Sequence, residues 1–188
     1  MIGAITAGLF SSGAAAGGGT SYESIATYSL SSAQSAVTFS SIPSTYKHLQ
    51  IRALTRDSGA GVYNTYKVTY NGDTASNYSV HAMYGQNINT VDQFGNANQT
   101  GMVVYATPGA VASGIFGAQI IDILDYADTN KYKTQRSLGG VNENNDTNLL
   151  AFMSGSWRST SAINSITITA NGANFAQYSH FALYGIKG

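Results

Sequence analysis

Residues 47–54 read Lys-His-Leu-Gln-Ile-Arg-Ala-Leu, a stretch in which apolar and polar side chains alternate. Successive side chains of a strand point to opposite faces, so one face of this stretch is apolar and the other is polar. The two sets are Leu49, Ile51 and Ala53 against His48, Gln50 and Arg52. This pattern predicts a strand that is buried on one side.

Similar stretches recur along the chain at a spacing of roughly 8–12 residues, which is typical of a β-sandwich. Tyr66, Val68 and Tyr70 alternate in the same way, and the tight turn Asn71-Gly72-Asp73 leads to a returning strand at residues 78–82. The strongest apolar run, residues 115–124, predicts a central buried strand.

We therefore expect an all-β protein with a jelly-roll-like antiparallel β-sandwich of about eight to ten strands. A single sandwich domain is expected over residues 21–188, and a polar strand over residues 131–138. Two polar segments without periodicity, residues 85–100 and 139–148, are expected to be surface loops.

Composition narrows the class of protein. Only 10% of the 188 residues are charged, and nine basic residues balance nine acidic ones. That balance argues against nucleic-acid binding, which depends on a surplus of Lys and Arg.

The absence of cysteine excludes disulfides and thiolate metal sites, and no apolar run is long enough for a membrane helix. A neutral surface suits packing against other subunits, although a secreted β protein with an uncharged surface fits as well.

Residues 1–20 contain no charged side chain and end in a Gly/Ala-rich segment. We expect an extended N-terminal arm with a flexible hinge, which anchors the protein to a partner subunit. The anchoring side chains are apolar: Ile2, Ile5, Leu9 and Phe10. A secretory signal is the competing interpretation, but the basic residues that such a signal requires are missing.

No catalytic motif is found, and the protein is expected not to be an enzyme or to use a cofactor. The three histidines, His48, His81 and His180, are expected to be structural. The group Asp122, Asp125 and Asp128 favours turn formation, with a weak divalent-cation site as the alternative. The 13 tyrosines suit strands and interfaces, and a sugar-stacking platform is the alternative.

Several segments together resemble a family of phage virion proteins that occurs in cyanophages and marine phages. They are Ser21-Tyr22-Glu23-Ser24-Ile25-Ala26, residues 41–52, Asn71-Gly72-Asp73, residues 121–126, residues 157–166 and residues 181–187. The resemblance covers nearly everything from residue 21 onward and carries over no catalytic residues. It implies a structural protein of the virion, assembled in the cytoplasm of the bacterial host.

From the resemblance and the composition together, we expect a capsid decoration or cement protein that attaches to the outer head shell and stabilises it. Its partners would be the major capsid protein or other virion subunits and further copies of itself, with a trimer favoured, and neither nucleic acid nor membrane. The alternative is a tail-fibre or baseplate component that binds host glycans through its tyrosines and residues 85–100. A secreted carbohydrate-active enzyme is the third hypothesis, for which no carboxylate pair can be named.

Overall fold

The computed structural model describes residues 21–87, 89–143 and 148–188. The predicted anchor residues Ile2, Ile5, Leu9 and Phe10 lie outside these ranges. Twelve strands and no helix are present in the described part of the chain, so no helix there could span a membrane. The all-β prediction and the two-sheet antiparallel sandwich are confirmed, whereas jelly-roll connectivity stays a prediction.

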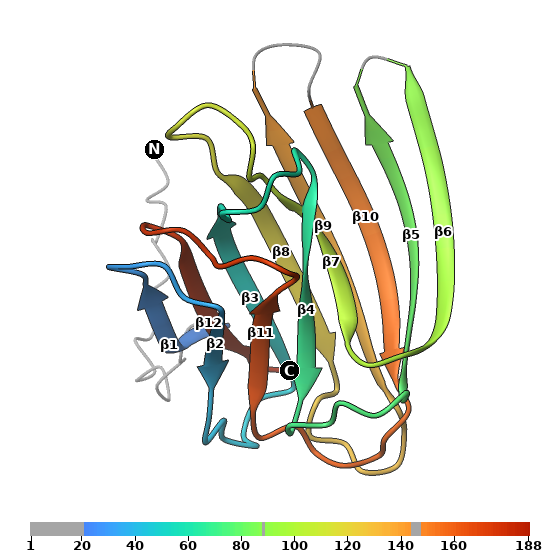
Figure 1. Ribbon diagram of the computed structural model, residues 1–188. Coiled ribbons are helices and arrows are strands. Elements are labelled where there is room, and N and C mark those ends of the chain that lie inside the picture. The colour runs from blue at the N-terminus through green and yellow to red at the C-terminus, as the bar shows by residue number, and fades with distance from the viewer. Residues whose placement is uncertain (1–20, 88, 144–147) are drawn as a thin grey trace, which may run out of the picture.

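The two sheets differ in size (Figure 1). The large sheet has eight strands, in the order β1 (Tyr22–Ser29), β12 (His180–Ile186), β3 (His48–Thr55), β8 (Gly117–Leu124), β9 (Lys133–Asn142), β10 (Asn148–Trp157), β5 (Tyr78–Gln86) and β6 (Thr90–Gln99). The small sheet has four strands, in the order β2 (Ala36–Phe39), β11 (Ile166–Ala170), β4 (Asn64–Tyr70) and β7 (Met102–Thr107). Every paired strand is antiparallel to its neighbour.

The alternation in residues 47–54 decides which face of the large sheet meets the small one. Leu49 and Ile51 are fully buried and pack in the main core with Ile121 and Ile123 of β8. Tyr66, Val68 and Tyr70 of β4 fill the same core from the small sheet, as their spacing predicted. We call the side of the large sheet that faces the small sheet its inner face and the opposite side its outer face.

The small sheet is too narrow to cover the whole inner face. Its last strand, β7, contacts β8, β9, β10 and β5 of the large sheet, and β6 lies beyond it (Figure 1). The far edge of the large sheet therefore projects past the small sheet.

Four sequence-based expectations were wrong. Residues 85–100 are not a loop but the end of β5 and the whole of β6, which pair as a hairpin. Part of residues 139–148 is also strand, since β9 runs to Asn142 and β10 begins at Asn148. The strand after Asn71-Gly72 does not return beside β4; β5 crosses to the large sheet and pairs with β10 and β6. The described strands also outnumber the expected eight to ten or so.

β6 was missed because eight of its ten side chains are polar or small and the two large apolar ones, Val91 and Phe94, are three residues apart, so hydrophobic alternation is absent. An edge strand that lies beyond the covering sheet needs no apolar face, because backbone hydrogen bonds to β5 suffice to hold it. Phe94 is the exception, and it packs against the small cluster of Val80, Ala82 and Met153.

β7 packs closely against the large sheet at Gly155 on β10. A Cβ atom at Gly155 would lie 2.6 Å from Met102 Sδ and 2.8 Å from the Ser79 carbonyl oxygen. The methionine side chain can move, but the backbone carbonyl is fixed by the sheet. Only glycine therefore fits here without shifting a strand.

We predict that Gly155→Ala lowers the free energy of unfolding by about 1–3 kcal/mol through overpacking. Denaturant unfolding of both proteins measures this as a lower transition midpoint with an unchanged slope. Gly85→Ala is the control, because the nearest atom to its added Cβ would be the Thr90 carbonyl oxygen at 3.8 Å. Equal midpoints for the two variants would contradict the close packing of β7 on β10.

Candidate functional site

The histidines do not form a site. His48 begins β3 at one end of the large sheet, whereas His180 pairs with Leu54 at the other end, and His81 lies two strands beyond β9 on β5. In residues 21–87, 89–143 and 148–188, no three His, Asp or Glu side chains are placed to hold a metal ion.

The three aspartates also stay apart. Asp122 lies on the outer face of β8, where its carboxylate accepts hydrogen bonds from Gln50 Nε2 at 2.8 Å and Arg136 Nε at 3.0 Å. Asp125 and Asp128 lie in the turn between β8 and β9, as predicted, and each is paired with lysine. Their carboxylates are already neutralised by protein cations, so the divalent-cation alternative gains no support at this turn.

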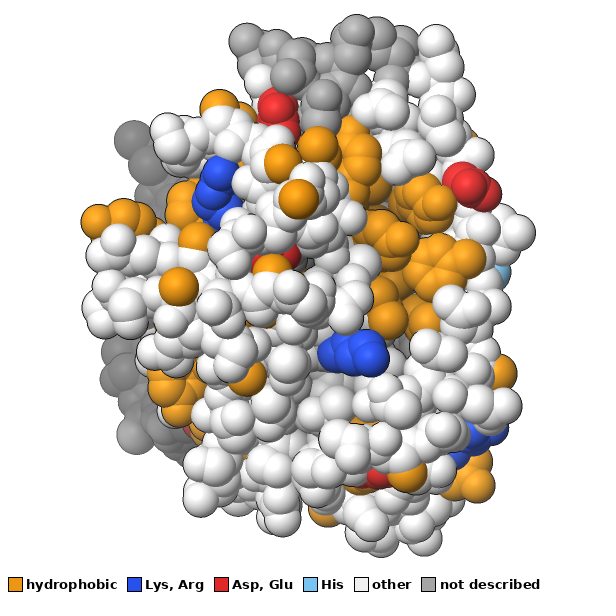
Figure 2. Space-filling view, in the orientation of Figure 1, with side chains coloured by type: hydrophobic (Ala, Val, Ile, Leu, Met, Phe, Trp, Pro, Cys, Tyr) orange, Lys and Arg blue, Asp and Glu red, His pale blue; other side chains and the backbone are white. Residues whose placement is uncertain are grey.

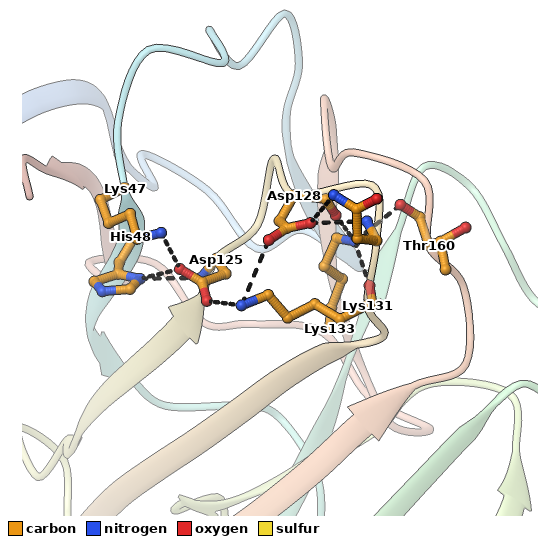
Figure 3. A network of polar contacts seen from close by, with 8 residues as sticks. Lys47, His48, Asp125, Asp128, Lys131, Lys133 and Thr160 are labelled. Carbon is orange, nitrogen blue, oxygen red and sulfur yellow. Dashed lines mark hydrogen bonds and ion pairs between the residues drawn. The ribbon is translucent and has the colours of Figure 1, made fainter.

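Asp125 is the centre of the polar network in Figure 3. Lys47 Nζ lies 2.9 Å from Oδ1 and Lys131 Nζ 2.5 Å from Oδ2. The Asp125 backbone N–H donates to His48 Nδ1 at 3.0 Å, which joins the turn to the start of β3. The two ammonium groups, first Lys131 and then Lys47, lower the pKa of Asp125 to about 2.

Lys133 supports the same turn from inside the sandwich (Figure 3). Its side chain is fully buried on the inner face of β9, and burial lowers its pKa. The ammonium group donates to the carbonyl oxygens of Asp128 at 2.5 Å, Lys131 at 3.0 Å and Thr160 at 3.0 Å. These bonds tie the β8–β9 turn to the segment after β10, so this network is structural.

We predict that Asp125→Asn lowers the free energy of unfolding at neutral pH by about 0.5–1 kcal/mol, as expected for partly solvated ion pairs. Asparagine tolerates the positive φ of 48° at this position, so the change tests charge alone. Because the pKa of Asp125 is depressed to about 2 in the folded protein, its stabilisation is present above about pH 4 and is lost as the pH falls toward 2.

Thermal unfolding followed by circular dichroism between pH 2 and pH 7 or so measures this effect. The melting curves of wild type and Asp125→Asn should differ at neutral pH and converge near pH 2 or so. Asp92→Asn removes the same charge where the described residues show no ion pair, and it should follow wild type. A constant difference between wild type and Asp125→Asn at every pH would contradict the ion-pair network.

The outer face of the large sheet carries a band of exposed apolar side chains. We call this band the apolar strip; its members are between 43% and 79% exposed and come from β3, β5, β6, β8, β9 and β10: Leu54, Met83, Val91, Ile120, Leu138, Leu150 and Phe152. Soluble monomers rarely expose a contiguous apolar band of this kind without using it for binding.

The strand register aligns the strip in two neighbouring rows. One row pairs Ile120 with Leu138, Leu138 with Phe152 and Phe152 with Met83. The next row runs from Leu54 through Ala118, Gly140, Leu150 and Gly85 to Val91. Its small residues leave a shallow hollow of about 550 Å³, lined in part by Leu54, Ile120, Leu138 and Leu150.

The remainder of the outer face, toward the β8–β9 turn, is polar. The row next to the strip contains Gln50, Asp122, Arg136, Ser154 and His81 in adjacent strands. Arg52 lies over the rings of Tyr22 and Tyr184, with its guanidinium carbon 5.5 and 5.2 Å from their centroids. The strip therefore has a sharp polar border on one side.

A second apolar area lies on the inner face, beside β7, where the large sheet projects past the small one (Figure 2). We call its three half-buried rings, Tyr84, Phe94 and Tyr105, the aromatic shelf. Tyr84 and Tyr105 are stacked at 5.5 Å with an interplanar angle of 10°, and Phe94 lies 5.7 Å from Tyr105. The Tyr84 hydroxyl donates to Asp92 Oδ2 at 3.2 Å.

Sequence reasoning missed both surfaces. The apolar run at residues 115–124 predicted a central buried strand; β8 is central, but only Ile121 is buried, whereas Ile120 is exposed. The run indicates two apolar faces but not what covers each of them. The predicted anchor residues are outside the described residues, so their part in a site is not tested by the geometry.

Comparison with known proteins does not identify a family for this chain. No family model, no curated protein and no solved structure matches the chain. Its function must therefore be inferred from the surfaces described above.

Proposed function

We propose that the protein is a non-enzymatic structural subunit of a phage particle, best fitted to decorate the outer head shell, and that it assembles there through the apolar strip, which contacts either the capsid protein or other subunits. The strip is the single observation that carries this proposal, because it is an apolar sheet face without a cover among the described residues. The proposal that this subunit belongs to a phage particle rests on the resemblance of residues 21–26, 41–52 and 121–126 to phage structural proteins.

The physical chemistry of the strip favours a protein surface as its partner. Water is excluded when a second apolar surface packs on the strip, and burial of the exposed part of each half-buried side chain contributes roughly 1 kcal/mol before ordering costs. The row from Ile120 to Met83 is apolar, and polar side chains such as Arg52 and His180 reach the hollow from neighbouring strands. The low charge of the chain as a whole keeps the desolvation cost of such a contact small.

We predict that Leu150→Asp combined with Phe152→Asp abolishes attachment to the particle without unfolding the protein. Both side chains are at least half exposed, so the fold loses little. Burying unpaired carboxylates in the interface should weaken attachment by about tenfold or more. Co-sedimentation of the full chain with purified virions measures bound protein, and cryo-electron microscopy of the wild-type particles locates it over the capsid lattice.

Tyr132→Asp is the matched control, because Tyr132 is as exposed as Phe152 but lies outside the strip, next to the β8–β9 turn. It should attach like wild type. Equal attachment of the strip variant and wild type would overturn the strip as the attachment surface. Density found only at the tail would overturn the head decoration proposal.

The aromatic shelf favours a second candidate function, the binding of host glycans by a tail-fibre or baseplate component. Tyr84, Phe94 and Tyr105 offer apolar ring surface beside the Asp92 carboxylate, and ring surface next to hydrogen-bonding groups suits sugars.

If the shelf binds glycans, Tyr105→Ala should abolish retention on a glycan array of host cell-surface sugars. Tyr178→Ala, which removes an exposed tyrosine outside the shelf, should leave retention unchanged. Circular dichroism checks that both variants remain folded. Absence of glycan binding by the wild-type chain, or equal binding by both variants, would remove this candidate.

A further inference from the structure

We propose that the occupant of the apolar strip is the N-terminal segment of a neighbouring copy of this chain, residues 2–10. This inference rests on the proposed function, since an assembly subunit needs contacts that link one copy to another. It names the partner of the strip, which the proposed function leaves open between capsid protein and other subunits.

The chemistry of the segment matches that of the strip. Residues 1–20 contain none of the nine acidic and nine basic side chains of the chain, and Ile2, Ile5, Leu9 and Phe10 are large and apolar. A segment with charges would leave them desolvated against Ile120, Leu138 and Phe152. The hollow over Ala118 and Gly140 provides room for a large side chain between Leu54 and Leu150.

The lengths also match. The strip crosses six adjacent strands, from β3 to β6, which at about 4.8 Å per strand spacing is roughly 24 Å. Nine extended residues span up to about 30 Å, so residues 2–10 can contact the whole strip when laid across the strands. Backbone polar groups of a segment lying on the exposed face remain accessible to water along its sides.

The connection to the sandwich is long enough to reach another copy. The segment joins β1, the edge strand of the large sheet, through residues 11–21, and a chain of that length can span at most roughly 36 Å. Tyr22 is level with His48 through Ile186, which puts it about 22 Å from Leu54 of the same chain. By length alone, the segment could reach the strip of its own chain or that of a neighbour. We assign it to the neighbour because an assembly subunit needs contacts between copies.

Cysteine cross-linking tests this assignment against a clean background, because the chain has no cysteine. Full-length Leu9→Cys and Leu150→Cys proteins are mixed and oxidised, and the cross-linked peptides are identified by mass spectrometry. A disulfide between residues 9 and 150 in this mixture joins two different chains. Thr38→Cys, an exposed position on β2 of the small sheet, replaces Leu150→Cys in the control mixture.

We expect the 9–150 disulfide to exceed the 9–38 disulfide by about tenfold or more, as binding raises the local concentration of the paired thiols. Equal yields would overturn the assignment. The double variant Leu9→Cys/Leu150→Cys separates the alternatives: a monomer with an internal disulfide, together with no 9–150 product in the mixture, shows that each strip takes its own N-terminal segment.

The outcomes also separate this inference from the proposed function. If neither cross-link forms but Leu150→Asp/Phe152→Asp still loses attachment to the particle, the strip contacts another virion protein and the occupant named here is wrong. If the strip variant attaches normally and no cross-link forms, both proposals fail.

Discussion

The large sheet is covered by the four-stranded sheet on part of one face only, and this partial cover determines the surface chemistry of the described part of the protein. A sheet has two faces, and the small sheet packs on part of one of them. The main core forms where the sheets overlap, around Leu49, Ile51 and Ile121. Apolar side chains remain at the surface in two places: the aromatic shelf on the inner face, where the large sheet projects past the small one, and the apolar strip on the outer face, on the side away from the small sheet.

Side-chain alternation explains why neighbouring residues of one strand differ in burial, because only the inner face meets the small sheet. Ile121 and Ile123 of β8 are fully buried, whereas Ile120 between Gln119 and Ile121 is 43% exposed. On β9 the relation is reversed: the inner face carries polar Gln135 and buried Lys133, and the outer face carries Leu138. Buried polar groups are tolerated only with partners, and Gln135 Oε1 accepts a hydrogen bond from the Tyr70 hydroxyl at 2.5 Å.

These residues also show how far the sequence could predict the structure. Alternation placed β3 and β4 correctly, and Asn71-Gly72 predicted a turn that the structure confirms with φ values of 52° and 68°. β6 was beyond prediction, because its stability comes from cross-strand hydrogen bonds to β5. The polar strand expected over residues 131–138 is the first part of β9, but the sequence could not show that Gln135 faces inward, because its partner Tyr70 is distant in sequence. The strip could be recognised as apolar but not as exposed, since exposure depends on whether another layer packs on the outer face of the large sheet.

Polarity along the outer face adds a constraint on any assembly through the strip. The rows nearest the β8–β9 turn hold charged and hydrogen-bonded groups, such as Asp122 with Arg136, while the strip occupies the rows toward Leu54. A partner that buried the whole face would desolvate those ion pairs without replacing their hydrogen bonds to water. Contact is therefore expected to stop at the polar border, which fixes the orientation of the sandwich and leaves the Asp125 network in solvent.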